Sequence, residues 1–85
     1  MKKENVIQEK SFQFALKVIG LYKILTAQKE FIISKQLLRS ATSIGANVQE
    51  STAAYSRKGF IHKLSISSKE ARETNYWLML LDESD

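Results

Sequence analysis

The sequence predicts an all-α fold, an antiparallel up-down helical bundle that we expect to be oligomeric. Apolar residues recur at three- and four-residue steps through three segments, at about residues 5–27, 34–53 and 57–81. No segment shows the sustained alternation of a β-strand or the turn signal of a hairpin. The connections between the segments are short, which favours antiparallel neighbours. A chain of 85 residues forms at most one domain, so we treat residues 1–85 as a single helical-bundle domain.

The first segment carries two apolar rows. One row follows three- and four-residue steps and consists of Phe12, Ala15, Leu16, Ile19 and Tyr22. The second row lies nearly opposite and consists of Phe14, Val18, Leu21 and Leu25. A helix with one neighbouring surface would leave one of these rows in water, which soluble monomers usually avoid. We therefore expect this helix to have two partners, and we expect Gly20 to allow a close crossing with one of them.

The second segment begins after the charged pair Lys29 and Glu30, with Ser34 as a candidate N-terminal cap. Its narrow apolar row consists of Leu37, Ala41, Ile44 and Val48. A polar stripe runs along the other side and consists of Arg39, Ser43, Asn47 and Glu50. Such a stripe is where we look for an interhelix hydrogen-bond network or a binding surface.

Ser56 is the candidate cap of the third segment, although Gly59 stands where a capping box would place Glu or Gln. This helix also has two faces. The first consists of Phe60, Leu64, Ala71, Asn75 and Leu78, with Ser67 and Ser68 beside it. The second is mixed and consists of Ile66, Glu70, Glu73, Trp77 and Leu80. The third helix thus offers two contact surfaces, as the first does.

Composition excludes several classes of function. The absence of cysteine rules out disulfides and thiolate metal sites and fits a reducing compartment. No apolar run approaches the roughly 18 residues of a membrane span, and the polar start lacks the apolar core of a signal peptide. We therefore expect a cytoplasmic protein without a membrane partner. The net charge of +4 favours contact with polyanions but is also common on ordinary solvated surfaces.

No residue pattern indicates catalysis, a metal site or a cofactor. His62 is the single histidine, and its neighbours Lys58 and Lys63 would discourage a bound cation. Ser67 and Ser68 point about 100° apart on a helix, and neither has a base that would make it a nucleophile. We therefore expect a protein that is not an enzyme.

Three groups of residues remain as candidates for a functional role. The polar stripe of Arg39, Ser43, Asn47 and Glu50 is predicted to form a structural network, with a solvated face and a binding site as alternatives. A basic set could contact nucleic acid, or could simply be helix-surface charge: Lys35, Lys58, Lys63, Lys69 and Arg72. The predicted oligomer interface consists of Phe14, Val18, Leu21, Leu25, Ile66, Trp77 and Leu80.

Two blocks of sequence resemble a known family. The run IISKQLLRSATSIGANVQEST from Ile32 to Thr52, followed by SRKGFIHKLSISSKEARETNYWLMLL from Ser56 to Leu81, is similar to the four-helix-bundle proteins encoded by intervening sequences in bacterial 23S rRNA genes. The accessory variability determinant proteins of diversity-generating retroelements resemble the same family. The similarity extends over roughly Ser11 to Asp82, with LLRSATSIGANVQE and KEARETNYWL as its most specific parts.

The resemblance implies an antiparallel four-helix bundle, in several members assembled as a ring-shaped pentamer. It also implies a scaffold that binds protein partners, among them a reverse transcriptase, and in some members nucleic acid through basic surfaces. The family continues into a loop and a fourth helix after the position of Leu81, whereas this sequence ends in DESD. We therefore expect a non-enzymatic, self-associating scaffold. The alternative is a module that binds RNA directly through a basic surface.

Overall fold

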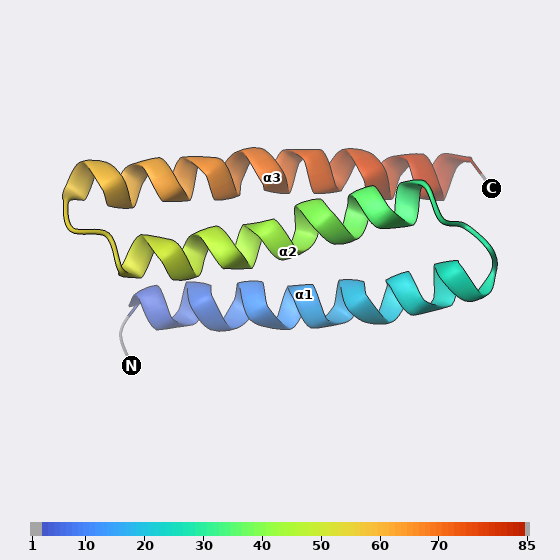
Figure 1. Cartoon of the computed structure of the whole chain (residues 1–85), viewed down its shortest axis with the longest axis horizontal. Coiled ribbons are helices and arrows are strands. Elements are labelled where there is room, and N and C mark those ends of the chain that lie inside the picture. Colours follow the sequence, from blue (N-terminus) through green and yellow to red (C-terminus); the bar gives the residue numbers. More distant parts are fainter. Residues whose placement is uncertain (1–2, 85) are drawn as a thin grey trace.

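The computed structural model describes residues 3–84 and contains three helices: α1 (Lys3–Ala27), α2 (Ile33–Thr52) and α3 (Arg57–Glu83). The prediction of an all-α fold is confirmed, and each helix end lies within two residues of the predicted position. Figure 1 shows the three helices side by side with alternating directions, and α2 lies between α1 and α3. In the described residues, the backbones of α1 and α3 each approach α2 but not each other. The helix α2 therefore has neighbours on two sides, and the outer helices have one each.

The first helix ends in a Schellman motif built on a lysine. Lys29 has a φ of 69°, the left-handed conformation that usually calls for glycine. The Glu30 N–H donates to the Leu25 carbonyl over 2.9 Å, and the Lys29 N–H donates to the Thr26 carbonyl over 2.9 Å. These two bonds satisfy carbonyl groups that a helix end leaves unpaired. The chain therefore turns sharply at the charged pair Lys29 and Glu30.

Glu30 caps the N-terminus of α2, and the prediction that Ser34 does so is wrong. The Glu30 carboxylate accepts from the N–H groups of Ile32 over 3.2 Å, Ile33 over 3.0 Å and Ser34 over 2.6 Å. Ser34 instead lies inside the first turn, where its hydroxyl donates to the Glu30 carbonyl over 2.7 Å. The hydrogen bond from the Ile33 N–H contributes most to lowering the pKa of Glu30 below its usual range. The reach of the longer glutamate side chain explains why a residue outside the helix can cap it.

Ser56 caps α3 as predicted. Its backbone is extended, and its hydroxyl accepts from the Gly59 N–H over 3.0 Å. Gly59 thus supplies the backbone donor of the cap, but it has no side chain that could return the bond of a capping box.

The centre of the layer is a small core between α2 and its two neighbours. It consists of Val18, Leu37 and Ala41, and the side chains packed around it come from all three helices: Phe14, Leu21, Leu25, Leu38, Trp77, Leu78 and Leu81. Leu37 and Ala41 are fully buried. The predicted apolar row of the second helix therefore becomes the centre of the fold.

The close approach between helices occurs at Gly45 and not at Gly20. A Cβ atom at Gly45 would lie 3.4 Å from the backbone oxygen of Ser11 on α1. A Cβ atom at Gly20 would have nothing within 4 Å. The small residue of α2 thus lets α1 pack closely, while Gly20 faces away from the rest of the chain.

Large apolar side chains remain uncovered on both outer helices. On α1, Phe12 is 61% exposed and Leu16 is 46% exposed. On α3, Tyr76 is 54% exposed and Met79 is equally open. No helix in the described part of the chain combines the length and the apolar character needed to cross a membrane.

The Glu30 cap gives the fold a testable pH dependence. Because the pKa of Glu30 is lowered in the folded chain, its contribution to stability is present above the unfolded-state pKa of about 4.5. It is lost as the pH falls through the lower folded-state pKa. We expect Glu30→Gln to lower the free energy of unfolding at pH 7 and to make a smaller difference at pH 3. Urea unfolding of both proteins, followed by circular dichroism, measures this, and an equal difference at both pH values would contradict it.

Candidate functional site

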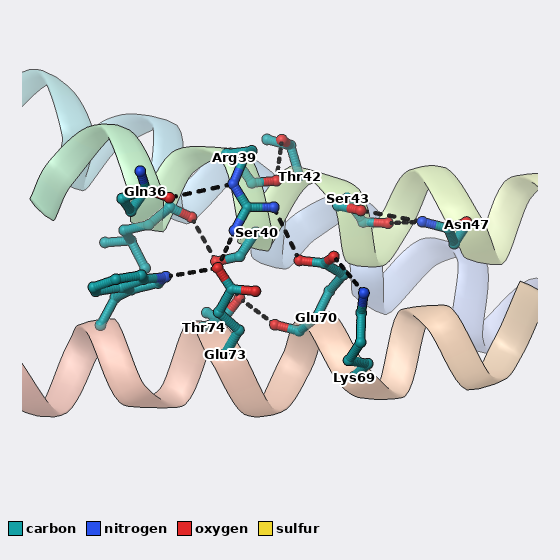
Figure 2. A network of polar contacts seen from close by, with 12 residues as sticks. Gln36, Arg39, Ser40, Thr42, Ser43, Asn47, Lys69, Glu70, Glu73 and Thr74 are labelled. Carbon is teal, nitrogen blue, oxygen red and sulfur yellow. Dashed lines mark hydrogen bonds and ion pairs between the residues drawn. The ribbon is translucent and has the colours of Figure 1, made fainter.

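A network of charged side chains joins α2 to α3. Figure 2 shows the guanidinium of Arg39 between two carboxylates of α3. Arg39 Nη1 lies 3.2 Å from Glu70 Oε1, and Nη2 pairs with Glu73 Oε2. Arg39 Nε also donates to Gln36 Oε1 over 3.4 Å. One arginine therefore holds two acidic residues, spaced three positions apart, on the same face of α3.

Two further groups complete the network. Trp77 Nε1 donates to Glu73 Oε2 over 3.2 Å, and this fixes the indole one turn beyond the carboxylate. Lys69 Nζ lies 3.8 Å from Glu70 Oε2, on the solvent side. The Trp77 ring meets the Tyr76 ring edge to face, with the ring centroids 5.3 Å apart. The network thus orients the aromatic residues near the end of α3.

Glu70 is the most demanding member because it is only 7% exposed. Burying a carboxylate is costly unless it is paired and hydrogen-bonded. Arg39 is about half exposed, so solvent screens its side of the pair. Losing the ion pair should therefore cost more free energy at the buried Glu70 carboxylate than at the half-exposed Arg39 guanidinium.

Small hydroxyl residues fill the interface between α2 and α3. Thr74 Oγ1 lies 2.8 Å from both Ser40 Oγ and the Glu70 carbonyl oxygen. Ser67 Oγ donates to the Ile44 carbonyl over 2.9 Å. In the described residues, every buried side-chain nitrogen or oxygen has a hydrogen-bond partner. These residues let the helices approach closely while leaving no polar atom unpaired.

The structure divides the predicted polar stripe of α2 into separate parts. Arg39 reaches across to α3. Asn47 Nδ2 instead donates within α2, to the Ser43 carbonyl over 2.9 Å and to Ser43 Oγ over 3.1 Å. Glu50 is exposed. The acidic partners of Arg39 are therefore Glu70 and Glu73 of the neighbouring helix α3. Glu50 is on the same helix as Arg39 but lies three turns away, which is too far for its carboxylate to reach the guanidinium.

The predicted basic set is also divided. Lys58, Lys69 and Arg72 are exposed and share the outward face of α3, and Tyr76 continues the same row. Lys63 lies on the opposite side of α3 and is half-buried, and Lys35 lies on α2. The solvent-exposed His62 lies beside the row. Of the predicted basic set, Lys58, Lys69 and Arg72 therefore share one face of α3, and Lys35 and Lys63 lie elsewhere.

The predicted oligomer interface falls largely within the single chain. Val18 is 4% exposed and sits in the core, so it has no surface left for a second copy. Phe14, Leu21, Leu25 and Trp77 pack against that core and are half-buried, as are Ile66 and Leu80. In the other α1 row, Phe12 and Leu16 remain exposed, whereas Ala15, Ile19 and Tyr22 are half-buried. The α1 residues of the predicted interface thus face α2 of the same chain.

An apolar groove of about 550 Å³ lies between α1 and α2. Its lining includes small and apolar residues, with Phe12 and Ala15 on α1 and Gly45 and Ala46 on α2. Gln8 Nε2 donates to Gln49 Oε1 over 2.5 Å among the residues that line it. Neither this groove nor a second one of about 540 Å³ near Val6 includes a member of the Arg39 network. The charged residues of the network pair with one another and lie outside both grooves.

Sequence reasoning placed Glu70, Glu73 and Trp77 on one face but did not identify them as the partners of Arg39. The spacing of Glu70 and Glu73, with Trp77 four positions further, was the available signal. In the described residues, no group of three acidic, histidine or cysteine side chains could hold a metal ion. The Arg39 network can hold α2 and α3 in register and can thereby position the outward face of α3.

The dependence of Glu70 on Arg39 can be measured. We expect Arg39→Met to lower the free energy of unfolding by about 1–3 kcal/mol, because it leaves a buried carboxylate without its main partner. Adding Glu70→Gln should recover part of that loss, so that the two changes are not additive. Arg72→Met is the matched control, since Arg72 is exposed and bonds only the Ser68 hydroxyl; it should cost less than about 0.5 kcal/mol. Equal costs for Arg39 and Arg72, or strict additivity, would contradict this account.

Comparison with known proteins gives a family match and a similar solved structure. The model of the 23S rRNA-intervening sequence protein family matches residues 3–85. A crystal structure of a protein with unknown function from the S23 ribosomal protein family, from Bacteroides thetaiotaomicron VPI-5482, is 54% identical to this chain, with a TM-score of 0.96. The alignment covers 99% of this chain and 76% of that chain. Among curated proteins, none matches. From the match over nearly its whole length, the chain belongs to the 23S rRNA-intervening sequence protein family.

Proposed function

We propose that this chain is a non-enzymatic helical scaffold that self-associates through the outward faces of α1 and α3. The supporting observation is that each outer helix packs against α2 with one side and leaves large apolar side chains in water on the other. Burying one such side chain contributes about 1.5–3 kcal/mol, so several together stabilise an assembly. Association would also enlarge the thin core of a short chain and could complete a closed bundle.

The internal pairing of charges supports a structural role. Arg39, Glu70 and Glu73 satisfy one another and leave no group poised to act on a substrate. In this proposal the network sets the position of α3, and with it the surface offered to other copies. The family resemblance favours protein partners, with a reverse transcriptase among the candidates. Composition favours a place in the cytoplasm. The ring-shaped pentamer and the kinship with retroelement accessory proteins are likewise predictions from the resemblance.

Self-association is tested by the mass in solution. We expect light scattering to give a multiple of the 9.7 kDa chain mass. Leu16→Asp combined with Met79→Asp, one change on each outward face, should weaken association at least tenfold while the helical content is kept. Val18→Asp is the contrasting variant and should unfold the chain, because it buries a charge in the core. A compact monomer of the unchanged protein at all concentrations would refute the scaffold proposal.

The basic row of α3 favours RNA binding as a second candidate. Lys58, Lys69 and Arg72 are exposed along one face, with Tyr76 available for stacking on a base. Three neutralised phosphates would give affinity for single-stranded RNA a slope of roughly −2 against the logarithm of salt concentration.

Changing Lys58, Lys69 and Arg72 together to Gln should remove most of this salt dependence and weaken binding. The control changes Lys10, Lys17 and Lys29 to Gln, since these lysines of α1 and its C-terminal turn are exposed and carry the same total charge. Fluorescence anisotropy with a labelled RNA at two salt concentrations measures the effect. Equal losses in both triple variants would show that net charge, and not this row, governs binding.

A further inference from the structure

The groove between α1 and α2 is largely apolar and is acidic at one end. Phe12 and Ala46 line it from the two helices, and both are exposed. Glu9 lines it near the N-terminal end of α1, and Glu50 follows the lining residue Gln49 at the same end. Within the described residues, neither carboxylate takes part in an ion pair. The groove therefore offers an apolar surface beside two negative charges that this part of the chain leaves without a counter-charge.

One face of α3 has the complementary character, and we call it the α3 face. It consists of Lys69, Arg72, Tyr76 and Met79, which follow one another at steps of three and four residues. All four are exposed, and the two apolar members are each 54% exposed. The Arg72 guanidinium takes part in no ion pair within the described residues and donates to the Ser68 hydroxyl of its own helix. The α3 face is therefore cationic in its first half and apolar in its second.

The two surfaces agree in length and in the order of their chemistry. Along α1, the groove runs from Glu9 to Ala15, about 9 Å along the helix axis. The α3 face runs from Arg72 to Met79, about 10.5 Å along its own axis. A helix that lies in the groove parallel to α1, with its arginine beside Glu9, therefore brings the apolar half of the α3 face over the apolar lining.

The two cations of the α3 face lie on opposite flanks. A step of three residues turns an α-helix by about 300°, so Lys69 and Arg72 diverge by about 60°. When α3 lies in the groove parallel to α1, the right-handed turn of the helix puts Arg72 on the α1 side and Lys69 on the α2 side. One cation is thus directed toward Glu9 and the other toward Glu50.

We propose that the groove of one copy receives the α3 face of a second copy, with that α3 parallel to the α1 of the receiving chain. Tyr76 and Met79 pack against the apolar lining, and the two cations pair with the two carboxylates. The inference rests on the proposed self-association and specifies which surfaces meet. Because each chain carries one groove and one α3 face, the contact is heterologous, and its repetition forms a ring where the rotation closes. It is compatible with the ring-shaped assembly that the family resemblance implies.

Charge favours this contact over the pairing of like surfaces. Two grooves placed together would either bring Glu9 against Glu9 or cover each carboxylate with the apolar lining of the other copy. Two α3 faces placed together would likewise leave Lys69 and Arg72 without a counter-charge. The groove and the α3 face supply opposite charges to each other, so the heterologous contact avoids both penalties.

The Arg39 network helps to fix the α3 face. The Tyr76 ring packs edge to face on the Trp77 ring, and Trp77 Nε1 donates to Glu73 Oε2. Glu73 is in turn paired with Arg39 of α2. The apolar half of the α3 face is therefore held in position before a second copy binds, which lowers the ordering cost of association.

A charge-reversal series tests the ion pair. Glu9→Arg or Arg72→Glu alone brings like charges together across the contact and should weaken association roughly tenfold. The double variant, Glu9→Arg with Arg72→Glu, restores an opposite pair and should return the dissociation constant to within about threefold of the original. Lys23→Glu is the matched control, since Lys23 is exposed and lines neither groove, and it should change association less than about twofold. Analytical ultracentrifugation measures association, and circular dichroism checks that each variant is folded.

A mixing experiment tests whether unlike surfaces meet. Ala46→Trp fills the groove and leaves the α3 face intact, whereas Met79→Asp spoils the α3 face and leaves the groove intact. Each variant alone should associate at least tenfold more weakly than the unchanged chain. An equimolar mixture should form a 1:1 complex of about twice the 9.7 kDa chain mass and grow no further, because one competent groove and one competent α3 face remain. Ala53→Trp, at an exposed position outside the groove, is the matched control and should assemble like the unchanged chain.

The outcomes separate this inference from the proposed function. Rescue by the double charge variant together with a 1:1 complex in the mixture would support the heterologous contact. If the unchanged protein associates but its association is insensitive to Ala46→Trp and Arg72→Glu, the proposed contact is wrong and the scaffold proposal stands. If Arg72→Glu weakens RNA binding and leaves association unchanged, the α3 face serves RNA and the contact is again wrong. If the unchanged protein is a monomer, both proposals fail.

Discussion

The packing of α2 against two neighbours is the constraint on which the rest of the structure depends. Leu37 and Ala41 are buried at its centre, and Gly45 lets α1 approach on one side. Ser40, facing Thr74, lets α3 approach on the other. Small residues on both sides of one helix bring three helices into a layer. A layer cannot enclose its outer helices, so each keeps an open face.

The polar contacts between α2 and α3 give that packing its specificity. Apolar side chains alone would tolerate small shifts of one helix along the other. Arg39 is held by two carboxylates and Glu73 also accepts from Trp77, so a shift by one turn would leave Glu70 buried without a partner. The network therefore fixes the register of α3 and the position of the Tyr76 and Trp77 rings. Function, in this view, follows from the shape and charge of the surfaces that remain open.

Local features of the fold could be predicted from the sequence with good precision. The helix ends followed from the apolar period and from residues such as Ser56, whose cap is present as expected. The cap of α2 was misassigned because Glu30 lies outside the helix and acts through a long side chain, which a rule based on serine at the first turn does not include. The faces that hold Arg39, Glu70 and Glu73 were also visible. Their pairing was not, because it depends on which helices become neighbours.

The sequence by itself determined that the chain is helical, where its helices begin and end, and that α1 has more apolar surface than one neighbour can cover. Only the tertiary structure decided that Val18 is buried while Phe12 and Leu16 remain open. The physical reason is that a helical period is a property of one segment and gives both rows of α1 similar apolar character. The choice between them depends on the fit against Gly45 and the core around Leu37, which are contributed by a different segment.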